Sequence, residues 1–298
     1  MKISTFAYFG GKFLLSNYIY EMMPPHRTFV EIFGGSGVIS MNKSPSDYDI
    51  FNDLNGDIYN FFMVLKEHDT TEELIRILKI YPYSRDWFYY CRDNYCLETD
   101  NIKRAAMWFY SMRVSFGGMG NAFSFQVNLG TKKLDERYAD ITKNLWTIHN
   151  RFKKITIENQ DFRILINRFN NPETLFYLDP PYVHSTRRGN DEYKHEMTDH
   201  DHYDLVNLLL PIKAKVILSG YDNEIYKILD DNGWNRMEIM VRVTCSRDAQ
   251  RIDRDKEKFL RKEVLWYNFE LKEQNLFENV VLEDNNEQDL FNFKEVLL

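Results

Sequence analysis

The sequence predicts an α/β fold in which a sheet domain carries one inserted helical lobe. Short apolar segments rich in β-branched and aromatic residues alternate with helical segments along much of the chain, as β-α-β units require. Between Asn55 and Arg151, by contrast, this strand signal nearly vanishes. The candidate strands are Thr28 to Phe33, Asp47 to Phe51, Lys154 to Ile157, Thr174 to Leu178, Lys215 to Ser219, Arg236 to Val243 and Glu263 to Phe269.

The strand-poor segment predicts the helical lobe. Apolar residues near its end recur at spacings of 4, 3, 4, 3 and 4, which places them on one face of a helix; they are Leu134, Tyr138, Ile141, Leu145, Ile148 and Phe152. We therefore assign residues 59–153 to the lobe, and residues 1–58 and 154–298 to the sheet domain. A lobe of roughly ninety residues is a plausible size at the small end of domains.

Composition narrows the class of protein. With 298 residues, 44% apolar and 28% charged, the chain is globular and long enough for a large core. No stretch approaches the roughly 18 consecutive apolar residues of a membrane span, and Met1 to Lys12 lacks a signal-peptide hydrophobic region. Cys91, Cys96 and Cys245 have no C-x-x-C spacing, so neither a disulfide framework nor a zinc site is predicted. We expect a cytoplasmic protein that needs no metal and does not bind membranes.

The net charge of −7 hides an uneven distribution. From Asn101 to Ile155, ten basic and three acidic residues give +7, whereas eight acidic and two basic residues from Glu270 to Leu298 give −6. A localised positive lobe is the electrostatic footprint of a phosphate-binding surface. A solvated helix face is the alternative.

A glycine-rich turn follows the first candidate strand. Glu31 to Gly37 read E-I-F-G-G-S-G and join that strand to a helix predicted from Val38 to Met41. Glycines let the backbone approach a ligand closely, and the N–H groups at a helix start favour an anionic group. A simple turn without a ligand is the alternative.

Acidic residues follow the second and third candidate strands. Asp53 is placed to bind the ribose hydroxyls of a nucleotide-like ligand, by the logic of dinucleotide-binding folds. It could equally be the N-cap of a helix that starts near Leu54. Asp161, in Asn159-Gln160-Asp161-Phe162, could likewise be the N-cap of a helix.

The fourth candidate strand ends in the tetrapeptide Asp179-Pro180-Pro181-Tyr182. A buried parallel strand that ends on a carboxylate directs that group into a ligand crevice. Two prolines take the chain off the ladder, so the Asp179 and Pro180 carbonyls lack neighbouring-strand partners. A carboxylate and a fixed carbonyl can accept both hydrogens of one amino group, and Tyr182 offers a flat face to a planar ring. The matching ligand is a nucleobase with an exocyclic amino group. A strand-ending turn is the alternative.

At this tetrapeptide the chain resembles the Dam-type (D12 class) N6-adenine-specific DNA methyltransferases, which carry Asp-Pro-Pro-Tyr here. Similar enzymes that methylate cytosine N4 tend to have Ser in place of Asp, and those that methylate protein glutamine tend to have Asn, so Asp179 favours adenine. The order of motifs also matches, from Tyr8-Phe9-Gly10-Gly11-Lys12 to a closing strand at Glu263 to Asn268. A P-loop at Tyr8 to Lys12 is rejected because G-x-x-x-x-G-K-[ST] is absent and no strand precedes it.

The resemblance implies a Rossmann-like S-adenosylmethionine-dependent methyltransferase sheet whose inserted lobe recognises the DNA target. It implies S-adenosylmethionine as cofactor, with Lys12 pairing with the methionine carboxylate, which would also meet the glycine-turn amides, and Asp161 accepting from the cofactor adenine amino group. The implied cofactor-binding residues are Tyr8, Gly11, Lys12, Phe33, Gly34, Gly35, Ser36, Gly37, Asp53, Asp161, Phe162 and Asp179, and the implied catalytic residues are Asp179, Pro180, Pro181 and Tyr182. We expect a monomer that acts on double-stranded DNA in a nucleoid or a phage-infected host cytoplasm.

The segment from Arg113 to Asn128 is glycine-rich, aromatic and inside the basic lobe. It reads as a loop or hairpin that reaches DNA, with Arg113, Asn121 and Gln126 suited to base edges and Lys132 and Lys133 to phosphates. Its pattern departs from that of the GATC-specific members, which puts a GATC target in doubt. A Gly-rich connector without base contacts is the alternative.

These observations predict direct methyl transfer to N6 of a flipped-out adenine in duplex DNA. In this reaction Tyr182 would stack on the base, while Asp179 and the Pro180 carbonyl accept the N6 hydrogens. Two alternatives stay open. Methylation of adenine in RNA would share every catalytic residue and differ only in the lobe. The other alternative is a non-catalytic DNA-binding protein with a decayed cofactor site, and the intact Gly, Asp and D-P-P-Y positions argue against it.

Overall fold

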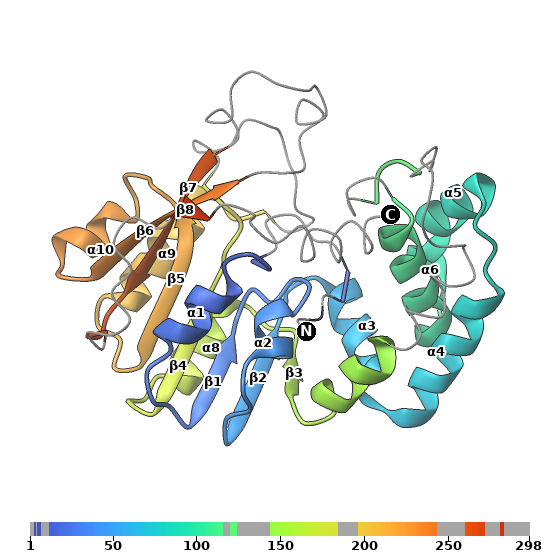
Figure 1. Ribbon diagram of the computed structural model, residues 1–298, viewed down its shortest axis with the longest axis horizontal. Helices are drawn as coiled ribbons and strands as arrows, with labels where there is room; N and C mark the ends of the chain where they lie inside the picture. The colour runs from blue at the N-terminus through green and yellow to red at the C-terminus, as the bar shows by residue number, and fades with distance from the viewer. Residues whose placement is uncertain are drawn as a thin grey trace.

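An eight-stranded sheet forms the centre of the computed structural model, which describes residues 3, 5–6, 12–115, 120–123, 144–183, 196–242, 260–271 and 281–282. The strand order is β3-β2-β1-β4-β5-β7-β6-β8 (Figure 1). The strands are β1 Thr28–Glu31, β2 Tyr48–Asn52, β3 Thr156–Glu158, β4 Thr174–Leu178, β5 Lys215–Tyr221, β6 Asn235–Arg242, β7 Leu260–Tyr267 and β8 Val281–Leu282.

The sheet is parallel from β3 to β5, and β7 then runs antiparallel to both β5 and β6. All five residues of β4 are buried, as expected for a central strand whose two faces are covered by helices. The carboxyl ends of β1, β2 and β4 therefore meet at one edge of the sheet. In open sheets of this type, ligands bind outside that edge.

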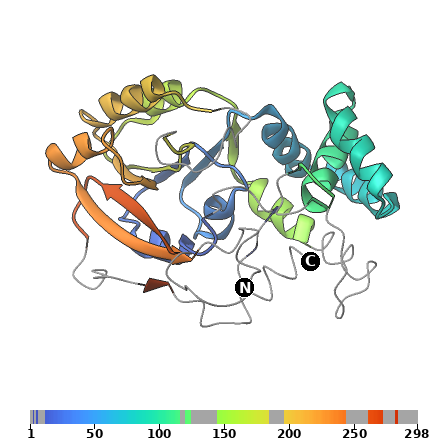
Figure 2. The same ribbon diagram turned by 90° about the horizontal axis from the view of Figure 1, so that it is seen from above.

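Helices cover both faces of the sheet (Figure 2). On one face, α1 Ser16–Met22 and α2 Val38–Asn42 pack on residues such as Phe29 and Leu175. On the other face, α8 Phe162–Phe169, α9 Asp199–Leu209 and α10 Lys227–Asp231 pack on residues such as Val30 and Phe176. Alternation along β1 and β4 thus divides their side chains between two separate cores.

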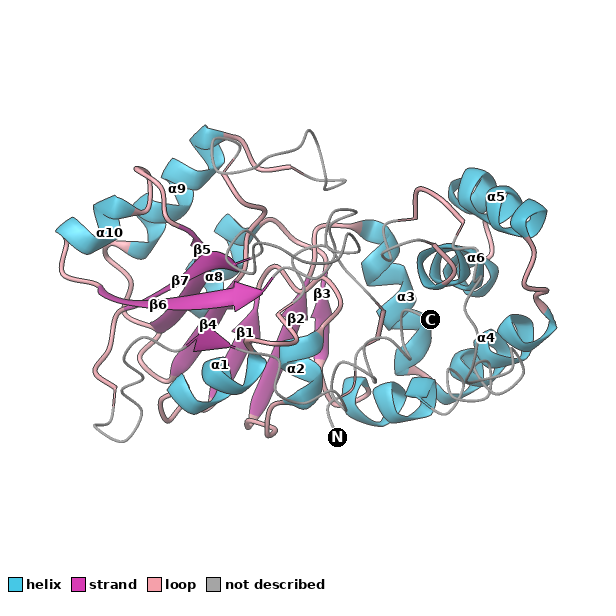
Figure 3. Cartoon of the chain, turned by 45° about the horizontal axis from the view of Figure 1, so that its top comes forward, coloured by secondary structure: helices cyan, strands magenta, loops and turns pink. Residues whose placement is uncertain are grey.

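The helical lobe stands beside the β3 edge of the sheet (Figure 3). It contains α3 Gly56–Lys66, α4 His68–Ile80, α5 Arg85–Asn94, a 3₁₀ turn at Tyr95–Leu97, α6 Asn101–Arg113 and a helix over 144–152. Seven consecutive residues of α6 are buried, because α3, α4 and α5 all pack against it. Side-chain caps at Asn55, Ser84 and Asp100 begin α3, α5 and α6.

Aromatic rings join the lobe to the sheet. Phe62 of α3 stacks on Phe152 with ring centroids 4.2 Å apart, and both rings meet Phe51 of β2 edge to face. Two ion pairs involve the lobe. Of the two, only the ion pair of Arg151 with Asp49 of β2, at 2.7 Å, joins the lobe to a strand; Arg104 of α6 pairs at 2.7 Å with the buried Asp57 of α3 inside the lobe. The lobe is thus packed on the sheet domain through a shared core.

The structure confirms the predicted α/β fold, and each predicted strand overlaps an observed strand, with ends that differ by up to three residues. Strand β8 was not predicted. Leu145, Ile148 and Phe152 of the predicted helical face are buried, whereas the first three residues of that face lie outside the described residues. The predicted boundary at residues 58 and 59 falls inside α3, and the division into two domains stays a prediction. No helix in the described ranges is long and apolar enough to cross a membrane.

Candidate active site

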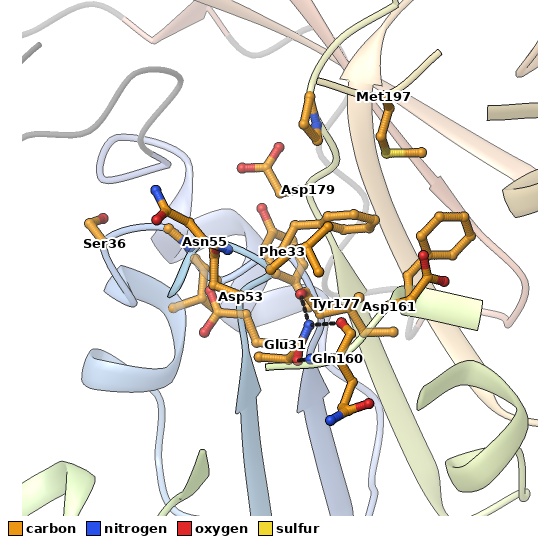
Figure 4. Close-up of a pocket in the computed structure, with 18 of the residues that line it drawn as sticks. Glu31, Phe33, Ser36, Asp53, Asn55, Gln160, Asp161, Tyr177, Asp179 and Met197 are labelled. Atoms are coloured by element: carbon orange, nitrogen blue, oxygen red, sulfur yellow. Dashed lines mark hydrogen bonds between the residues drawn. The ribbon is translucent and has the colours of Figure 1, made fainter. Parts of the chain in front are cut away.

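A cavity opens at the carboxyl ends of β1, β2 and β4 (Figure 4). In Figure 4, Ser36 and Asp53 lie on one side of the cavity, Asp161 and Met197 on the other, and Asp179 between them. The aromatic rings of Phe33 and Phe162 also line the cavity. The lining residues predicted from the sequence are Lys12, Phe33, Gly34, Gly35, Ser36, Asp53, Asp161, Phe162, Asp179 and Pro181.

Asp179 directly follows β4, and its carboxylate is held through one oxygen. Oδ1 accepts from the Ser219 hydroxyl at 2.9 Å and lies 2.9 Å from the Lys12 ammonium. Within the described ranges no donor reaches Oδ2. The side chain is 19% exposed at the cavity wall. Burial raises the pKa of the Asp179 carboxyl, whereas Lys12 and Ser219 pull it back toward its usual range. One anchored and one available oxygen make Asp179 a directional hydrogen-bond acceptor.

Lys12 is buried between two carboxylates. Its ammonium contacts Asp179, donates to the Tyr182 hydroxyl and lies 3.8 Å from Glu263 Oε2. Burial alone would lower its pKa, but the charges of Asp179 and Glu263 outweigh burial, and the pKa of Lys12 is raised. Because Asp179 already pairs with this ammonium, a methionine carboxylate would have to compete with Asp179 for Lys12.

Tyr182 lies behind the cavity wall rather than on it. Its ring is 5% exposed and contacts Tyr221, with centroids 4.3 Å apart, and its hydroxyl donates to Glu263 at 2.8 Å. Pro181, in contrast, lines the cavity. A base that stacks on Tyr182, as expected from the sequence, therefore requires Tyr182 or its neighbours to move.

Packing against aromatic rings constrains the glycine turn at Gly34 and Gly37, in addition to any ligand that the turn binds. Gly37 has a φ of 68°, and a Cβ there would lie 2.9 Å from the Phe152 ring. A Cβ on Gly34 would lie 2.1 Å from the Phe51 ring. Both positions therefore require glycine whether or not a ligand binds.

Several amides of this turn already donate within the protein. Gly34 donates to the Asn52 carbonyl, Gly35 to Asp53 Oδ2 and Gly37 to the Gly34 carbonyl. The Ser40 amide, in the first turn of α2, donates to Glu31 Oε2 at 3.0 Å. A cofactor carboxylate would have to use other amides of the turn, such as those of Ser36, Val38 and Ile39.

Two lining residues that the sequence did not single out are Glu31 and Asn52. Glu31, the last residue of β1, is buried, and burial raises its pKa to about 8. The Asn52 side chain donates to the carbonyls of Ile32 and Gln160 and accepts from the Gln160 amide, which ties together the ends of β1, β2 and β3. Both residues could have been predicted from the sequence as cavity-lining residues, because each is the last residue of a parallel strand.

Asp53 and Asp161 occupy opposite sides of the cavity. Asp53 Oδ2 accepts from the Gly35 amide at 2.7 Å and Oδ1 from Asn55 at 2.8 Å, and burial raises its pKa to about 6. Asp53 is not the helix cap that the sequence allowed, because α3 begins later and Asn55 caps it. Asp161 does cap α8, and its carboxylate also pairs with Arg163 at 2.9 Å.

The predicted DNA-binding residues are only partly within the described ranges. Arg113 ends α6, and burial lowers the pKa of its guanidinium to about 10. Asn121 is exposed beside an antiparallel bridge between Ser115 and Phe123, which fits the predicted hairpin. The predicted DNA-binding residues Gln126, Lys132 and Lys133 lie outside the described ranges, as do the predicted cofactor-binding residues Tyr8 and Gly11. Arg104 and Arg151, counted in the basic lobe, instead form ion pairs inside the protein.

Comparison with known proteins agrees with this geometry. Residues 8–244 match the model of the D12 class N6 adenine-specific DNA methyltransferase family, which is most of the chain. The chain belongs to this family. The D12 match spans both the cavity at the carboxyl ends of β1, β2 and β4 and the whole helical lobe.

Three relatives carry related names. A DNA N-6-adenine-methyltransferase of Escherichia phage P1 is 24% identical over 85% of this chain and 34% of its own length. The modification methylase StsI of Streptococcus sanguinis is 25% identical over 63% of this chain and 30% of its own length. A DNA adenine methylase of Serratia marcescens is 24% identical over 72% of this chain and 82% of its own length. The chain thus spans about a third of the length of the first two relatives.

Proposed function

We propose that the protein transfers a methyl group from S-adenosylmethionine to N6 of a flipped-out adenine in double-stranded DNA. The observation that carries this proposal is the Asp179 carboxylate, with Oδ1 anchored by Lys12 and Ser219 and Oδ2 available at the cavity. Family membership and the names of the relatives agree with this chemistry.

The cavity residues fit S-adenosylmethionine, which supplies an electrophilic methyl group on a positively charged sulfonium. Glu31, Asp53 and Asp179 surround the cavity with carboxyl groups, which favour a cationic ligand. The rings of Phe33 and Phe162, with centroids 5.8 Å apart, offer apolar surface to a purine. Asp53 would hold ribose hydroxyls and Asp161 the cofactor adenine.

The protein's own part in the reaction is to orient and stabilise the target amine. Asp179 Oδ2 and the Pro180 carbonyl would accept the two N6 hydrogens, and this favours a more tetrahedral nitrogen whose lone pair is directed at the methyl group. Orientation of two reactants contributes up to roughly 7–11 kcal/mol in well-aligned cases. Positive charge that develops on the nitrogen is stabilised by the Asp179 carboxylate in a water-poor site.

The helical lobe supplies the proposed DNA surface. Within the described ranges Arg113 makes no ion pair, whereas Arg104 and Arg151 are paired with carboxylates. The half-buried Arg113 guanidinium, 6.0 Å from the Phe109 ring, would be available to a base edge or a phosphate. The Arg113 side chain, Asn121 and the neighbouring Gln126, Lys132 and Lys133 would then read and hold the duplex.

The test is methyl transfer by purified protein, measured as N6-methyladenine by mass spectrometry of the digested nucleic acid. We expect product with duplex DNA, and none above background with RNA. Asp179→Ala should lower the rate by more than about a hundredfold, the low end of what such catalytic groups supply, while calorimetry still detects S-adenosylmethionine binding. Product with RNA alone would support the RNA alternative, and absence of cofactor binding would support the decayed-site alternative.

A further inference from the structure

A buried carboxylate that does not line the cavity stands behind the proposed catalytic residues. Glu263 lies on β7, the antiparallel strand next to β5, and is 7% exposed. Its Oε1 accepts from the Tyr182 hydroxyl at 2.8 Å, and its Oε2 lies 3.8 Å from the Lys12 ammonium. Lys12 in turn contacts Asp179. Glu263 is therefore connected to Asp179 and Tyr182 without reaching the ligand side itself.

We propose that Glu263 is a positioning residue for methyl transfer, which fixes the Tyr182 phenol and the Lys12 ammonium so that Asp179 keeps Oδ2 available for the target amine. This inference rests on the proposed function, because it assigns an effect on the same reaction. It adds a strand, β7, to the elements that shape the site.

The hydrogen bonds make the Tyr182 hydroxyl a fixed junction. Its oxygen accepts from Lys12, and its proton is donated to Glu263. Displacement of the Tyr182 side chain would break both bonds at once, and Tyr221 packs against its ring in addition. A buried donor or acceptor that loses its partner destabilises the protein, so the three groups favour a single arrangement.

The charges explain why Lys12 does not simply neutralise Asp179. One buried ammonium is shared by two buried carboxylates, Asp179 and Glu263, which leaves the trio with a net negative charge when all three are ionised. Removal of Glu263 would leave Lys12 with Asp179 as its one carboxylate partner in the described part of the chain. The ammonium could then follow Asp179 more closely and compete with the target amine for its oxygens.

The first test compares Glu263→Gln with the wild type in single-turnover methylation of duplex DNA. Gln keeps an oxygen that can accept from Tyr182 but removes the charge. We expect the transfer rate to fall by about tenfold, the low end of losses found when an outer partner that orients a site residue is removed. S-adenosylmethionine affinity should stay unchanged, since Glu263 does not line the cavity. Glu238→Gln, on the exposed side of the neighbouring strand β6, is the matched control and should keep the wild-type rate.

The pH profile separates positioning from simple loss of stability. The groups that face Lys12 are Asp179, Glu263, Tyr182 and Tyr221. Burial lowers the pKa of Lys12, and the two carboxylates raise it above its usual value. A raised Lys pKa keeps the ammonium charged until the pH passes that pKa, so loss of Glu263 should bring deprotonation to lower pH. As the pH is raised, the Glu263→Gln rate should therefore begin to decline at a lower pH than the wild-type rate.

Tyr182→Phe gives the second test, and as a single variant it remains informative if a Glu263 variant is unstable; where both variants fold, the two are combined in a double-mutant cycle. Tyr182→Phe removes the hydroxyl that bonds to both Lys12 and Glu263. The variant should transfer methyl groups more slowly and bind S-adenosylmethionine as tightly as the wild type. The two effects should be less than additive, because Tyr182→Phe removes, and Glu263→Gln weakens, the same hydrogen bond between Tyr182 and residue 263. Full additivity, or a Glu263→Gln enzyme with the wild-type rate and pH profile, would overturn the proposal. If the wild type itself does not methylate DNA, the proposed function fails instead, and that outcome is recognised before any variant is compared.

Discussion

At the scale of single residues, the cavity combines buried acids with few compensating cations. Glu31 is the clearest case, because burial raises its pKa to about 8 and its carboxyl group accepts from the Ser40 amide. In the ligand-free protein Glu31 is therefore largely protonated at neutral pH. A cationic ligand beside it would favour the ionised form.

Glu31→Gln tests this pKa through the free energy of unfolding. A folded-state pKa above the unfolded value of about 4.5 gives a stability contribution that is complete below pH 4.5 and lost as the pH rises to about 8. Gln lacks this dependence, so the variant should gain stability relative to the wild type across that window, by at most about 5 kcal/mol. Urea denaturation at pH 5, 7 and 9 measures the difference. The exposed Glu72→Gln is the control, and an equal pH trend in both variants would contradict the assignment.

At the scale of elements, the glycine turn lies between the cavity and the lobe. Its Gly37 is in the left-handed region with the Phe152 ring of the lobe beside it. The ring of Phe51, on β2, closes off Gly34 in the same way. The turn that faces the ligand on one side is thus packed on lobe aromatics on the other.

Gly37→Ala should destabilise the protein by about 1–3 kcal/mol, since a left-handed Ala is strained and its Cβ meets Phe152 at 2.9 Å. The matched control is Gly56→Ala in the first turn of α3, where a Cβ meets nothing within 4 Å. There we expect no loss, or a gain of about 0.4–1 kcal/mol. Urea denaturation compares the two, and equal stability of both variants would show that the turn is not constrained as described.

The ion pair between Arg151 and Asp49 is the second link between lobe and sheet. Arg151→Met leaves the buried Asp49 with Lys43 as its one described cationic partner, and we expect a loss of about 3 kcal/mol. Arg76→Met removes an exposed pair with Glu73 on α4 and should cost less than about 1 kcal/mol. Similar losses in the two variants, measured by thermal or urea unfolding, would mean that the buried pair contributes no more than a surface pair.

The sequence predicted what depends on local pattern. Strand β4 matches the predicted bounds, because its five residues form an apolar run that ends at Asp179. Strand β8 has two residues and depends on pairing with β6, so no local pattern marks it. The contact between Lys12 and Asp179 joins residues far apart in the chain and was also not predicted. The roles assigned to the site residues stay predictions that these experiments test.

At the scale of the whole molecule, the acidic cavity and the basic lobe carry opposite charges, and we expect them to bind different partners. The net charge is −7, yet the segment that contains Arg113 carries +7. Because the lobe is positive and the rest of the chain is negative, an approaching DNA duplex would be oriented toward the lobe. The aromatic core shared by Phe51, Phe62 and Phe152 would then keep the lobe fixed relative to the cavity.

Substitutions in the lobe should separate phosphate contacts from base contacts. Lys132→Ala and Lys133→Ala should weaken DNA binding similarly on all sequences and reduce the slope of log affinity against log salt by about one for each lost phosphate contact. Arg113→Ala should instead relax sequence preference, at a cost of about 1–3 kcal/mol. Lys79→Ala, on the exposed face of α4, is the control. Salt titrations of binding that give the wild-type slope for both lysine variants would exclude them from the DNA surface.

The most direct measurement is sequencing with modified-base detection on DNA from a methylation-deficient host that expresses the chain, with mass spectrometry of the nucleosides alongside. We predict N6-methyladenine confined to one short sequence with the wild type, and none above the empty-vector level with Asp179→Ala. Folded wild-type protein that leaves the DNA unmodified, or an Asp179→Ala variant that modifies it equally, would contradict the proposed role of Asp179.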